Sequence, residues 1–443
     1  MTASPFYQEP FTTQVMPLNT SRLFRALSPV KPLNIAKEID QKYYIDFSDV
    51  RGGHVTRRLA RTIESQHDMP TCQLFTGHIG CGKSTELLCL QTRLTQAGFH
   101  VVFFESSDEM DLNDVDVTDV LMAIARQVSA SLEAIEISLK PSYFVRLFRE
   151  VSEILKTPVE ISNVQFSVGL ASISATTKDS PELRRQMRQI MEPRTGNILE
   201  SINQELLQPA SEALRAKGYQ GLVVLIDNLD RLDNTEKAGK TQPAYLFVDR
   251  GEQLRRLQCH VVYTIPIVLL FSNEAVPLSD RYGADPQVLP MVIVRHADER
   301  ICESGLTLMR QLLLARAFPE SPPAQRLERV YELFDSLDTL DQLCLASGGH
   351  VRNLLKLCFS CLQEVDPPFS GQLVAQQIQK QRNNMLNAIT PDEMELLQQV
   401  RQAKQVHGEA GYEKLLKSMF VFEYRSTDHG HWFDVNPILY GDL

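Results

Sequence analysis

The alternation of apolar and polar positions along the chain predicts buried strands separated by helices. The expected strands are short apolar runs at Cys72–Phe75, His100–Glu105, Leu222–Ile226, His260–Thr264 and Val288–Val294. A helical repeat of leucines over Ser84–Gln96 follows the first run, and the amphipathic segment Val55–Ser65 precedes it. The order of strand, glycine-rich loop, helix and strand is that of a βαβ unit. We therefore predict an α/β fold with a parallel sheet flanked by helices.

A long interval at about 106–220 separates the second expected strand from the third. Apolar residues recur there at helical spacing between Val120 and Ile135, and again over Phe144–Leu155. Apolar and polar residues alternate over Val159–Ser174, which predicts a β-hairpin. We expect this interval to be a helical insertion that carries one hairpin.

Changes in the pattern divide the chain into four expected units, at 1–33, 34–300, 301–385 and 386–443. The first contains five prolines and little periodicity, so we expect an extended N-terminal arm or a partly disordered tail. The second would contain the sheet, and the third reads as short helices that form a lid. The fourth combines two helical stretches with two final apolar runs, which predicts a winged-helix-like module.

The composition is that of an ordinary globular protein, with 43% hydrophobic and 23% charged residues in a chain of 443. The apolar run from Val261 to Phe271 is too short to cross a bilayer, and the first residues lack a secretory pattern. We therefore expect a cytoplasmic protein without a membrane span. The eight cysteines show no framework spacing, and we interpret the isolated pair Cys358 and Cys361 as small core residues, because structural zinc needs four ligands.

The strongest chemical signal is a complete phosphate-binding loop between the first strand and the helix that follows it. Its residues are Gly77, His78, Ile79, Gly80, Cys81, Gly82, Lys83, Ser84 and Thr85, which fit the pattern GxxxxGK[ST]. The glycines allow backbone N–H groups to turn toward phosphate oxygens, and the helix adds its positive N-terminal end. Lys83 would reach the β- and γ-phosphates of ATP, and Ser84 would coordinate Mg²⁺.

An acidic residue ends the apolar strand Leu222–Ile226. In a parallel sheet, ligands bind at the carboxyl ends of the strands, so Asp227 lies where a carboxylate for Mg²⁺ belongs. Arg352 gives a second indication, because it occupies the first turn of a predicted helix. Cations are disfavoured there, so we expect Arg352 to face an anion.

Together these residues resemble the P-loop ATPases of the AAA+ and STAND groups over about 41–364. The segment Asp227-Asn-Leu-Asp230-Arg is similar to the second acidic motif of NACHT and KAP proteins, and Gly348-Gly-His-Val-Arg352 to the lid motif of origin-recognition-type AAA+ proteins. The resemblance implies that Arg352 contacts the γ-phosphate and distinguishes ATP from ADP.

The resemblance also implies an acid beside Asp227 that polarises the attacking water, but Asn228 stands there. Asp230 becomes the expected residue for orienting water. If position 228 is the site of the base, hydrolysis is slow or absent, because an amide cannot accept a proton. We therefore expect an ATP hydrolase whose rate depends on which residue acts as the base.

Three further residues take expected roles from the resemblance, each with an alternative that stays open. Thr264 would stand between Asp227 and the γ-phosphate, or simply end its strand. Arg281 would reach the nucleotide of a neighbouring subunit, or pair with Asp280 or Asp285 on the surface. Tyr44, or else Val50, would pack on the adenine base, or belong to the core.

The basic helix containing Arg184, Arg185, Arg188 and Arg194 is interpreted as a solvated face, with an intersubunit or nucleic-acid contact as the alternative. The chain as a whole carries a net charge of −10, and from Pro391 onward nine acidic residues outnumber five basic ones. Phosphate backbones need Lys and Arg, so this balance disfavours nucleic acid as the main partner.

We therefore expect a regulatory ATPase that acts as a nucleotide-dependent conformational or assembly switch. Its C-terminal module would mediate self-association or bind a protein partner. Two alternatives remain: a nucleic-acid-handling ATPase similar to replication initiators or transposition regulators, and an ATP-binding scaffold that hydrolyses little.

Overall fold

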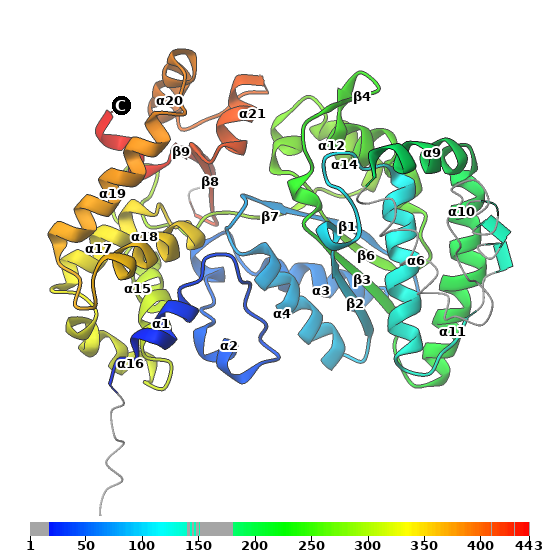
Figure 1. Cartoon of the computed structure of the whole chain (residues 1–443), viewed down its shortest axis with the longest axis horizontal. Helices are drawn as coiled ribbons and strands as arrows, with labels where there is room; N and C mark the ends of the chain where they lie inside the picture. The colour runs from blue at the N-terminus through cyan, green and yellow to red at the C-terminus, as the bar shows by residue number, and fades with distance from the viewer. Residues whose placement is uncertain are drawn as a thin grey trace, which may run out of the picture.

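The computed structural model describes residues 17–139, 180–408, 410–428 and 430–442, together with residues 142, 143, 146, 147 and 150. At its centre lies a five-stranded parallel sheet in the order β2-β3-β6-β1-β7 (Figure 1). The strands are β1 (Cys72–Gly77), β2 (His100–Glu105), β3 (Leu222–Asp227), β6 (His260–Thr264) and β7 (Gln287–Leu289). The predicted α/β fold with a parallel sheet flanked by helices is confirmed.

Different helices cover the two faces of the sheet, because successive side chains of a strand point to opposite faces. The even-numbered residues of β3, from Leu222 to Ile226, pack with the helices α6 (Val117–Glu133), α10 (Thr195–Ser201) and α11 (Gln208–Ala216). The odd-numbered residues Val223 and Leu225 pack with α3 (Val55–Ser65) and α4 (Lys83–Gln96). All of β3 is buried, as a strand covered on both faces must be.

The fifth strand is shorter than the predicted run Val288–Val294, because β7 ends at Leu289. Pro290 follows, and proline has no N–H to offer to a ladder. The next three backbone N–H groups bond to three different segments. Met291 donates to Glu423 O at 3.0 Å, Val292 to Gly349 O at 3.4 Å and Ile293 to Val50 O at 3.0 Å. This extended segment therefore ties the core to the N-terminal region, the predicted lid and the C-terminal hairpin.

The insertion after β2 is helical where the structure describes it. It contains α5 (Ser106–Glu109), α6, α9 (Pro181–Met191), η2 (Glu192–Arg194), α10, the π-helix η3 (Ile202–Leu207) and α11. The side chains of Asp116 and Asp119 form a capping box at the start of α6. The predicted hairpin Val159–Ser174, and most of the predicted helix Phe144–Leu155, lie outside the described residues.

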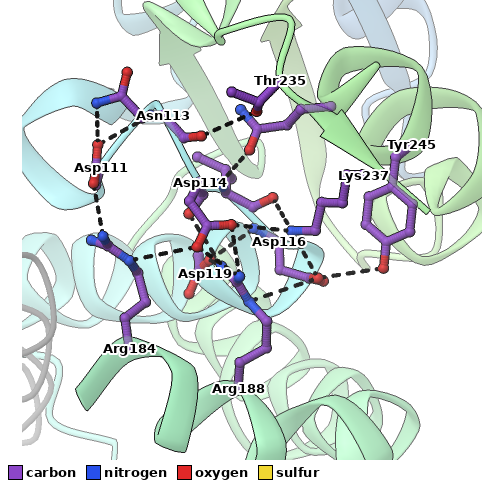
Figure 2. Close-up of polar contacts among 12 residues, drawn as sticks. Asp111, Asn113, Asp114, Asp116, Asp119, Arg184, Arg188, Thr235, Lys237 and Tyr245 are labelled. Carbon is purple, nitrogen blue, oxygen red and sulfur yellow. Dashed lines mark hydrogen bonds and ion pairs between the residues drawn. The ribbon is translucent and has the colours of Figure 1, made fainter. Parts of the chain in front are cut away.

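Figure 2 shows how α9 is attached to the loop before α6. The ion pairs join Arg184 to Asp111 at 2.9 Å, Arg188 to Asp114 at 2.7 Å and to Asp119 at 3.3 Å, and Lys237 to Asp116 at 3.2 Å. The predicted solvated face is therefore wrong for Arg184 and Arg188, whose side chains are only 10% and 18% exposed. Four aspartates in the loop before α6 and the first turn of that helix require nearby positive charge, and these arginines supply it. The prediction holds for Arg185, which is 69% exposed.

The N-terminal region differs from the extended arm that its prolines predict. Residues Thr20–Ala26 form helix α1, and Leu23 and Leu27 lie one helical turn apart and are fully buried. The short helices α2 (Glu38–Tyr43) and η1 (Ser48–Val50) follow before α3. Residues 1–16 lie outside the described part.

The helices after residue 300 and the C-terminal hairpin share one hydrophobic core, which also receives Leu23 and Leu27. These elements are α15 (Glu303–Ala317), α16 (Pro323–Arg326), η7 (Leu327–Glu332), α17 (Leu337–Ala346), α18 (Val351–Glu364), α19 (Gly371–Leu386), α20 (Pro391–Ala403), α21 (Ala410–Lys417), β8 (Val421–Ser426), β9 (Gly430–Val435) and η8 (Pro437–Asp442). The strands β8 and β9 pair antiparallel, so the predicted C-terminal hairpin is confirmed. Cys358 and Cys361 are buried in this core as free thiols.

Short elements complete the connections on the core side. They are η4 (Leu229–Arg231), β4 (Glu236–Lys237), β5 (Lys240–Thr241), α12 (Gln242–Ala244), η5 (Tyr245–Asp249), α13 (Gly251–Arg255), η6 (Ile267–Phe271) and α14 (Ala275–Tyr282). Among the described residues, no helix combines the length and apolar character that a membrane crossing requires.

Replacing Arg188 with alanine is expected to lower the free energy of unfolding by about 2–4 kcal/mol. The change leaves Asp114, Asp116 and Asp119 with less positive charge around them, and breaking a partly buried ion pair on one side is costly. Urea unfolding followed by circular dichroism measures the loss. Arg185→Ala on the same helix is the matched control and should change stability by less than about 0.5 kcal/mol. Equal stability of the two variants would contradict the anchoring role of Arg188.

Candidate functional site

The phosphate loop connects β1 to α4, and its backbone has the curled form that the glycines predict. Gly80 and Gly82 have φ values of +90° and +113°, which L-residues rarely adopt. A Cβ atom on Gly80 would also lie 2.8 Å from Cε1 of His350. Helix α4 begins at Lys83, so its positive N-terminal end adjoins the loop. This arrangement is suited to bind an anion.

Lys83 is buried in the loop, and its ammonium group is fully engaged. Nζ donates to Gly77 O at 2.7 Å and to His78 O at 2.9 Å, and it lies 2.9 Å from Oδ2 of Asp230. Burial alone lowers the pKa of Lys83, but the negative charges around it, Asp230 first, raise this pKa above its usual value. The group therefore stays cationic, and a phosphate that binds it must replace at least one of these acceptors.

Asp227 ends β3 with one carboxylate oxygen committed and one without a partner. Its Oδ1 accepts the N–H of Asn228 at 2.8 Å, whereas Oδ2 is buried and lacks a hydrogen bond within the described residues. Burial and the charge of Asp230 raise the pKa of Asp227, and the nearby hydroxyl of Ser84 acts in the opposite direction. A buried, unpartnered carboxylate oxygen beside a hydroxyl fits the oxygen ligands that Mg²⁺ takes.

Thr264 lies at the end of β6, next to β3, with its hydroxyl fully used by the protein. Its Oγ1 donates to Ile226 O and accepts from Leu229 N, both at 3.1 Å. The side chain is completely buried. Thr264 therefore fixes the turn that follows Asp227, and its hydroxyl has no proton left to donate to a phosphate.

Two guanidinium groups, Arg352 of α18 and Arg231 of η4, line the same pocket as the phosphate loop. Arg352 donates through Nε to Pro29 O at 3.0 Å, and its backbone N–H donates to Gly80 O at 3.3 Å. Burial and the positive charge of Arg231 lower the pKa of Arg352. Within the part of the chain that the structure describes, neither arginine pairs with a carboxylate. Two unneutralised cations in one pocket favour an anionic ligand.

The loop is held from outside by the start of α18 and by β8. His350 accepts the N–H of Asn353 at Nδ1 at 3.0 Å, so its Nε2 carries the proton donated to Ile79 O at 2.9 Å. His78 accepts the N–H of Glu423 at its Nε2 at 3.0 Å. The ring of Phe422 lies between the two imidazoles, stacked on His350 and edge-on to His78. The phosphate loop, α18 and the C-terminal hairpin therefore form one contact.

The remaining wall of the pocket is largely apolar and comes from distant segments. The pocket encloses roughly 1070 Å³ including the open space at its mouth, and its apolar lining includes Leu33, Tyr43, Tyr44, Ile45, Leu312 and Leu355. The Tyr44 hydroxyl donates to Glu86 at 3.4 Å, and Thr85 accepts the N–H of Leu33 at 3.2 Å. Tyr44 thus lies in the pocket, where a base could pack, whereas Val50 is buried in the core.

Four predicted site residues are absent from the lining of the pocket: Gly77, His78, Thr264 and Arg281. Arg281 is the one of these four that belongs neither to the phosphate loop nor to the end of a neighbouring strand. It lies on α14, where its carbonyl accepts from Arg255 at 2.7 Å and its side chain adjoins Gly251. The described residues form no ion pair with it, so the predicted pairing with Asp280 or Asp285 is not seen. Its action on a neighbouring subunit stays a prediction.

The structure brings to this site four further residues that have no role among the predictions from sequence: Glu105, Arg231, His350 and Phe422. For Glu105 a signal existed, because it ends the apolar strand His100–Glu105 in the same way as Asp227 ends its strand. The position of Phe422 depends on chain folding over hundreds of residues, and no local pattern could indicate it.

No model of a protein family matches the chain, and no curated protein matches it either. Among solved structures, a Walker-type ATPase of Pyrococcus abyssi is 12% identical with a TM-score of 0.43, covering 94% of this chain and 99% of its own. The Drosophila origin recognition complex bound to DNA is 12% identical with a TM-score of 0.36, covering 99% of this chain and 96% of that one. The protein Cdc6p of Pyrobaculum aerophilum is 12% identical with a TM-score of 0.36, covering 90% and 94%.

Identity and structural scores this low say nothing about function. The fold assignment rests on the phosphate loop, which lies at the carboxyl end of β1 in a parallel sheet. The predicted P-loop fold is therefore confirmed.

Acidification is expected to destabilise the contact between the loop and α18. Burial lowers the pKa of His78 to about 4 and that of His350 to about 3, whereas an unfolded histidine titrates near 6.5. Below pH 6.5 these histidines are protonated in the unfolded chain but stay neutral in the folded chain. The free energy of unfolding therefore falls as the pH falls.

The variant His350→Gln keeps an N–H that can reach Ile79 O but removes one titrating ring. Its loss of stability between pH 7 and pH 5 should be smaller than that of the wild type by about 2 kcal/mol, at about 1.4 kcal/mol per pH unit and proton. Urea unfolding at the two pH values measures the difference. The same pH dependence in both proteins would exclude His350 as its source.

Proposed function

We propose that this chain, which has the fold of a P-loop ATPase, is a regulatory ATPase that acts as a nucleotide-dependent conformational switch. One observation carries the proposal: the loop that would hold the phosphates is also the contact point of α18 and of the C-terminal hairpin. A ligand that moves the loop must therefore alter its fit to both elements.

ATP is the ligand that the pocket suits. The loop N–H groups and Lys83 would bind the β- and γ-phosphates, and the apolar wall with Tyr44 would hold the base. Ser84 and the free oxygen of Asp227 would hold Mg²⁺, which would neutralise phosphate charge. Arg352 and Arg231 lie in the same pocket without carboxylate partners and would contact the γ-phosphate.

The switch would arise because phosphate oxygens compete with acceptors of the protein for Lys83 and Arg352. Lys83 is held by Asp230 and two loop carbonyls, and Arg352 by the carbonyl of Pro29. Phosphate oxygens would take over these donors and draw α18 toward the loop. ATP would then favour one arrangement of the lid and ADP, without a γ-phosphate, another. Such coupling needs a difference in affinity between the two arrangements, and Arg352 can supply it.

The C-terminal module is suited to a protein contact, including self-association, more than to DNA. Four of its five basic residues, Arg401, Lys404, Lys417 and Arg425, already form ion pairs within the chain. Their charges are thereby largely neutralised, whereas binding to a phosphate backbone depends on available cations. Sub-micromolar, salt-dependent binding to duplex DNA would contradict this interpretation and favour a nucleic-acid-handling ATPase.

Lys83→Ala tests whether the loop binds nucleotide. Removing a charge-assisted donor that is worth about 1.5–3 kcal/mol should weaken ATP binding about 10- to 100-fold. Isothermal titration with ATP and Mg²⁺ measures the affinity, and circular dichroism verifies that the variant is folded. Lys414→Ala, at an exposed position of α21, is the control and should bind like the wild type. Unchanged affinity in Lys83→Ala would refute the proposed function.

Arg352→Ala tests whether the lid distinguishes ATP from ADP. Affinity for ATP should fall about 10-fold or more, while affinity for ADP should stay within about threefold, because only ATP offers a γ-phosphate to Arg352. Hydrodynamic size with ATP, ADP and a non-hydrolysable analogue should differ between nucleotides in the wild type and not in the variant. Lys356→Ala, exposed one turn further along α18, is the matched control. Equal losses for ATP and ADP would show that Arg352 does not read the γ-phosphate.

A further inference from the structure

Asn228, the residue after Asp227, cannot act as a base, but its side-chain amide donates hydrogen bonds to two residues of a neighbouring segment. The side-chain Nδ2 of Asn228 donates to Oε2 of Glu105 at 2.6 Å and to Oγ of Ser107 at 3.2 Å. Asn228 adopts a left-handed conformation with φ of +66°, which Asn tolerates better than most residues. Its amide is thereby aimed sideways, at the neighbouring strand.

Glu105 lies at the same level as Asp227 in the sheet. The two residues are register partners at the carboxyl ends of the parallel strands β2 and β3. Strands of a sheet are about 4.8 Å apart, and partners in register point to the same side. Glu105 accordingly lines the same pocket as Lys83 and Asp227.

Four carboxylates line this pocket, and three of them are already committed. Glu86 is bound by Arg51 at 2.8 Å and by Thr56 at 2.6 Å. Asp230 is paired with Lys83, and Asp227 is the residue that fits Mg²⁺. Glu105 receives the amide of Asn228 on Oε2, and its Oε1 has no partner among the described residues. Once Asp227 is assigned to Mg²⁺, Glu105 is the carboxylate of this pocket that has an unbonded oxygen and forms no ion pair within the described residues.

We infer that Glu105 is the general base for ATP hydrolysis at this site and that Asn228 is the residue that positions it. The inference rests on the proposed function. The water oxygen forms a bond to the γ-phosphorus as the bond from the γ-phosphorus to the β–γ bridging oxygen breaks, and ADP leaves with that electron pair. The proton of the water passes to Oε1 of Glu105 and then to the released phosphate or to solvent. No acidic residue follows Asp227 directly in the sequence. Glu105 on the adjacent strand β2 thus supplies this acid.

Asp230, the residue expected from sequence to orient water, is less suited to this task. Its Oδ2 lies 2.9 Å from the ammonium of Lys83, and its side chain is only 5% exposed. A carboxylate this close to an ammonium group is favoured in its ionised form, so Asp230 is a weak proton acceptor as long as this ion pair holds. Glu105 can accept a proton without breaking an ion pair.

The variant Glu105→Gln separates hydrolysis from binding. ATP affinity should stay within about threefold of the wild type, whereas single-turnover hydrolysis with protein in excess should fall about 100-fold or more, the usual contribution of a general base. Glu200→Gln makes the same substitution at an exposed position of α10 and should leave both quantities unchanged.

Asn228→Ala tests the positioning role. It should lower kcat about 10-fold with KM within about twofold, because the carboxylate remains but loses its orientation. A variant that was merely less stable would keep its kcat per folded molecule. If Asn228→Ala raised KM by a larger factor than it lowered kcat, Asn228 would act in nucleotide binding, and its positioning role would be overturned.

The outcomes distinguish the inference from the proposed function. If the wild type does not bind ATP, the proposed function fails. If it binds ATP without hydrolysing it above the background, the chain is an ATP-binding scaffold and Glu105 is not a base. If Glu105→Gln hydrolyses ATP within threefold of the wild type while Asp230→Asn does not, the base is Asp230 and the inference is overturned.

Discussion

The structure depends on one crowded contact, in which the phosphate loop is bound on its outer side by two other parts of the chain. His350 and the backbone of Arg352 bond to the carbonyls of Ile79 and Gly80, while Glu423 bonds to His78. Gly80 is required there, because any side chain would collide with His350. The loop cannot change shape without disturbing α18 and β8, so a phosphate that altered the loop would act on the C-terminal half through direct contacts.

The charges of the pocket are balanced in a way that a phosphate would change. Lys83 and Asp230 neutralise each other in a buried position, and Asp227 keeps one oxygen unbonded beside them. Arg352 and Arg231 line the same pocket and have no acidic partners in the described chain. An anion bound in the pocket would relieve the repulsion between the arginines and compete with Asp230 for Lys83. The same charges would therefore govern both its affinity and the shape of the pocket.

Local pattern was sufficient for the sheet and for the residues that come directly from the phosphate-loop motif. Strands β2 and β6 and helix α3 match their predicted bounds, because runs of apolar residues report burial. The end of β7 was missed, because Pro290 interrupts the ladder within an apolar run. The pairing of the basic helix α9 with the acidic loop before α6 was also missed, since ion pairs between segments about seventy residues apart leave no periodic signal. The bond between Glu105 and Asn228 could not be predicted either, because it joins two residues that lie 123 positions apart in the sequence.

Because Asn228 follows Asp227 on β3, the acid for hydrolysis would come from Glu105 on the neighbouring strand β2. This position affects how hydrolysis could be controlled. Glu105 is followed directly by α5 and then by the loop that carries Asp111 and Asp114. That loop is fastened to α9 of the insertion by Arg184 and Arg188 (Figure 2). A base located directly after Asp227 would be fixed by the buried strand β3 alone, whereas Glu105 sits on the edge strand β2, at the start of a segment anchored to the insertion. The carboxylate of Glu105 is oriented by the amide of Asn228, and the chain that follows it is fixed to α9, so a partner that moved α9 would reach the base through this segment without touching the nucleotide.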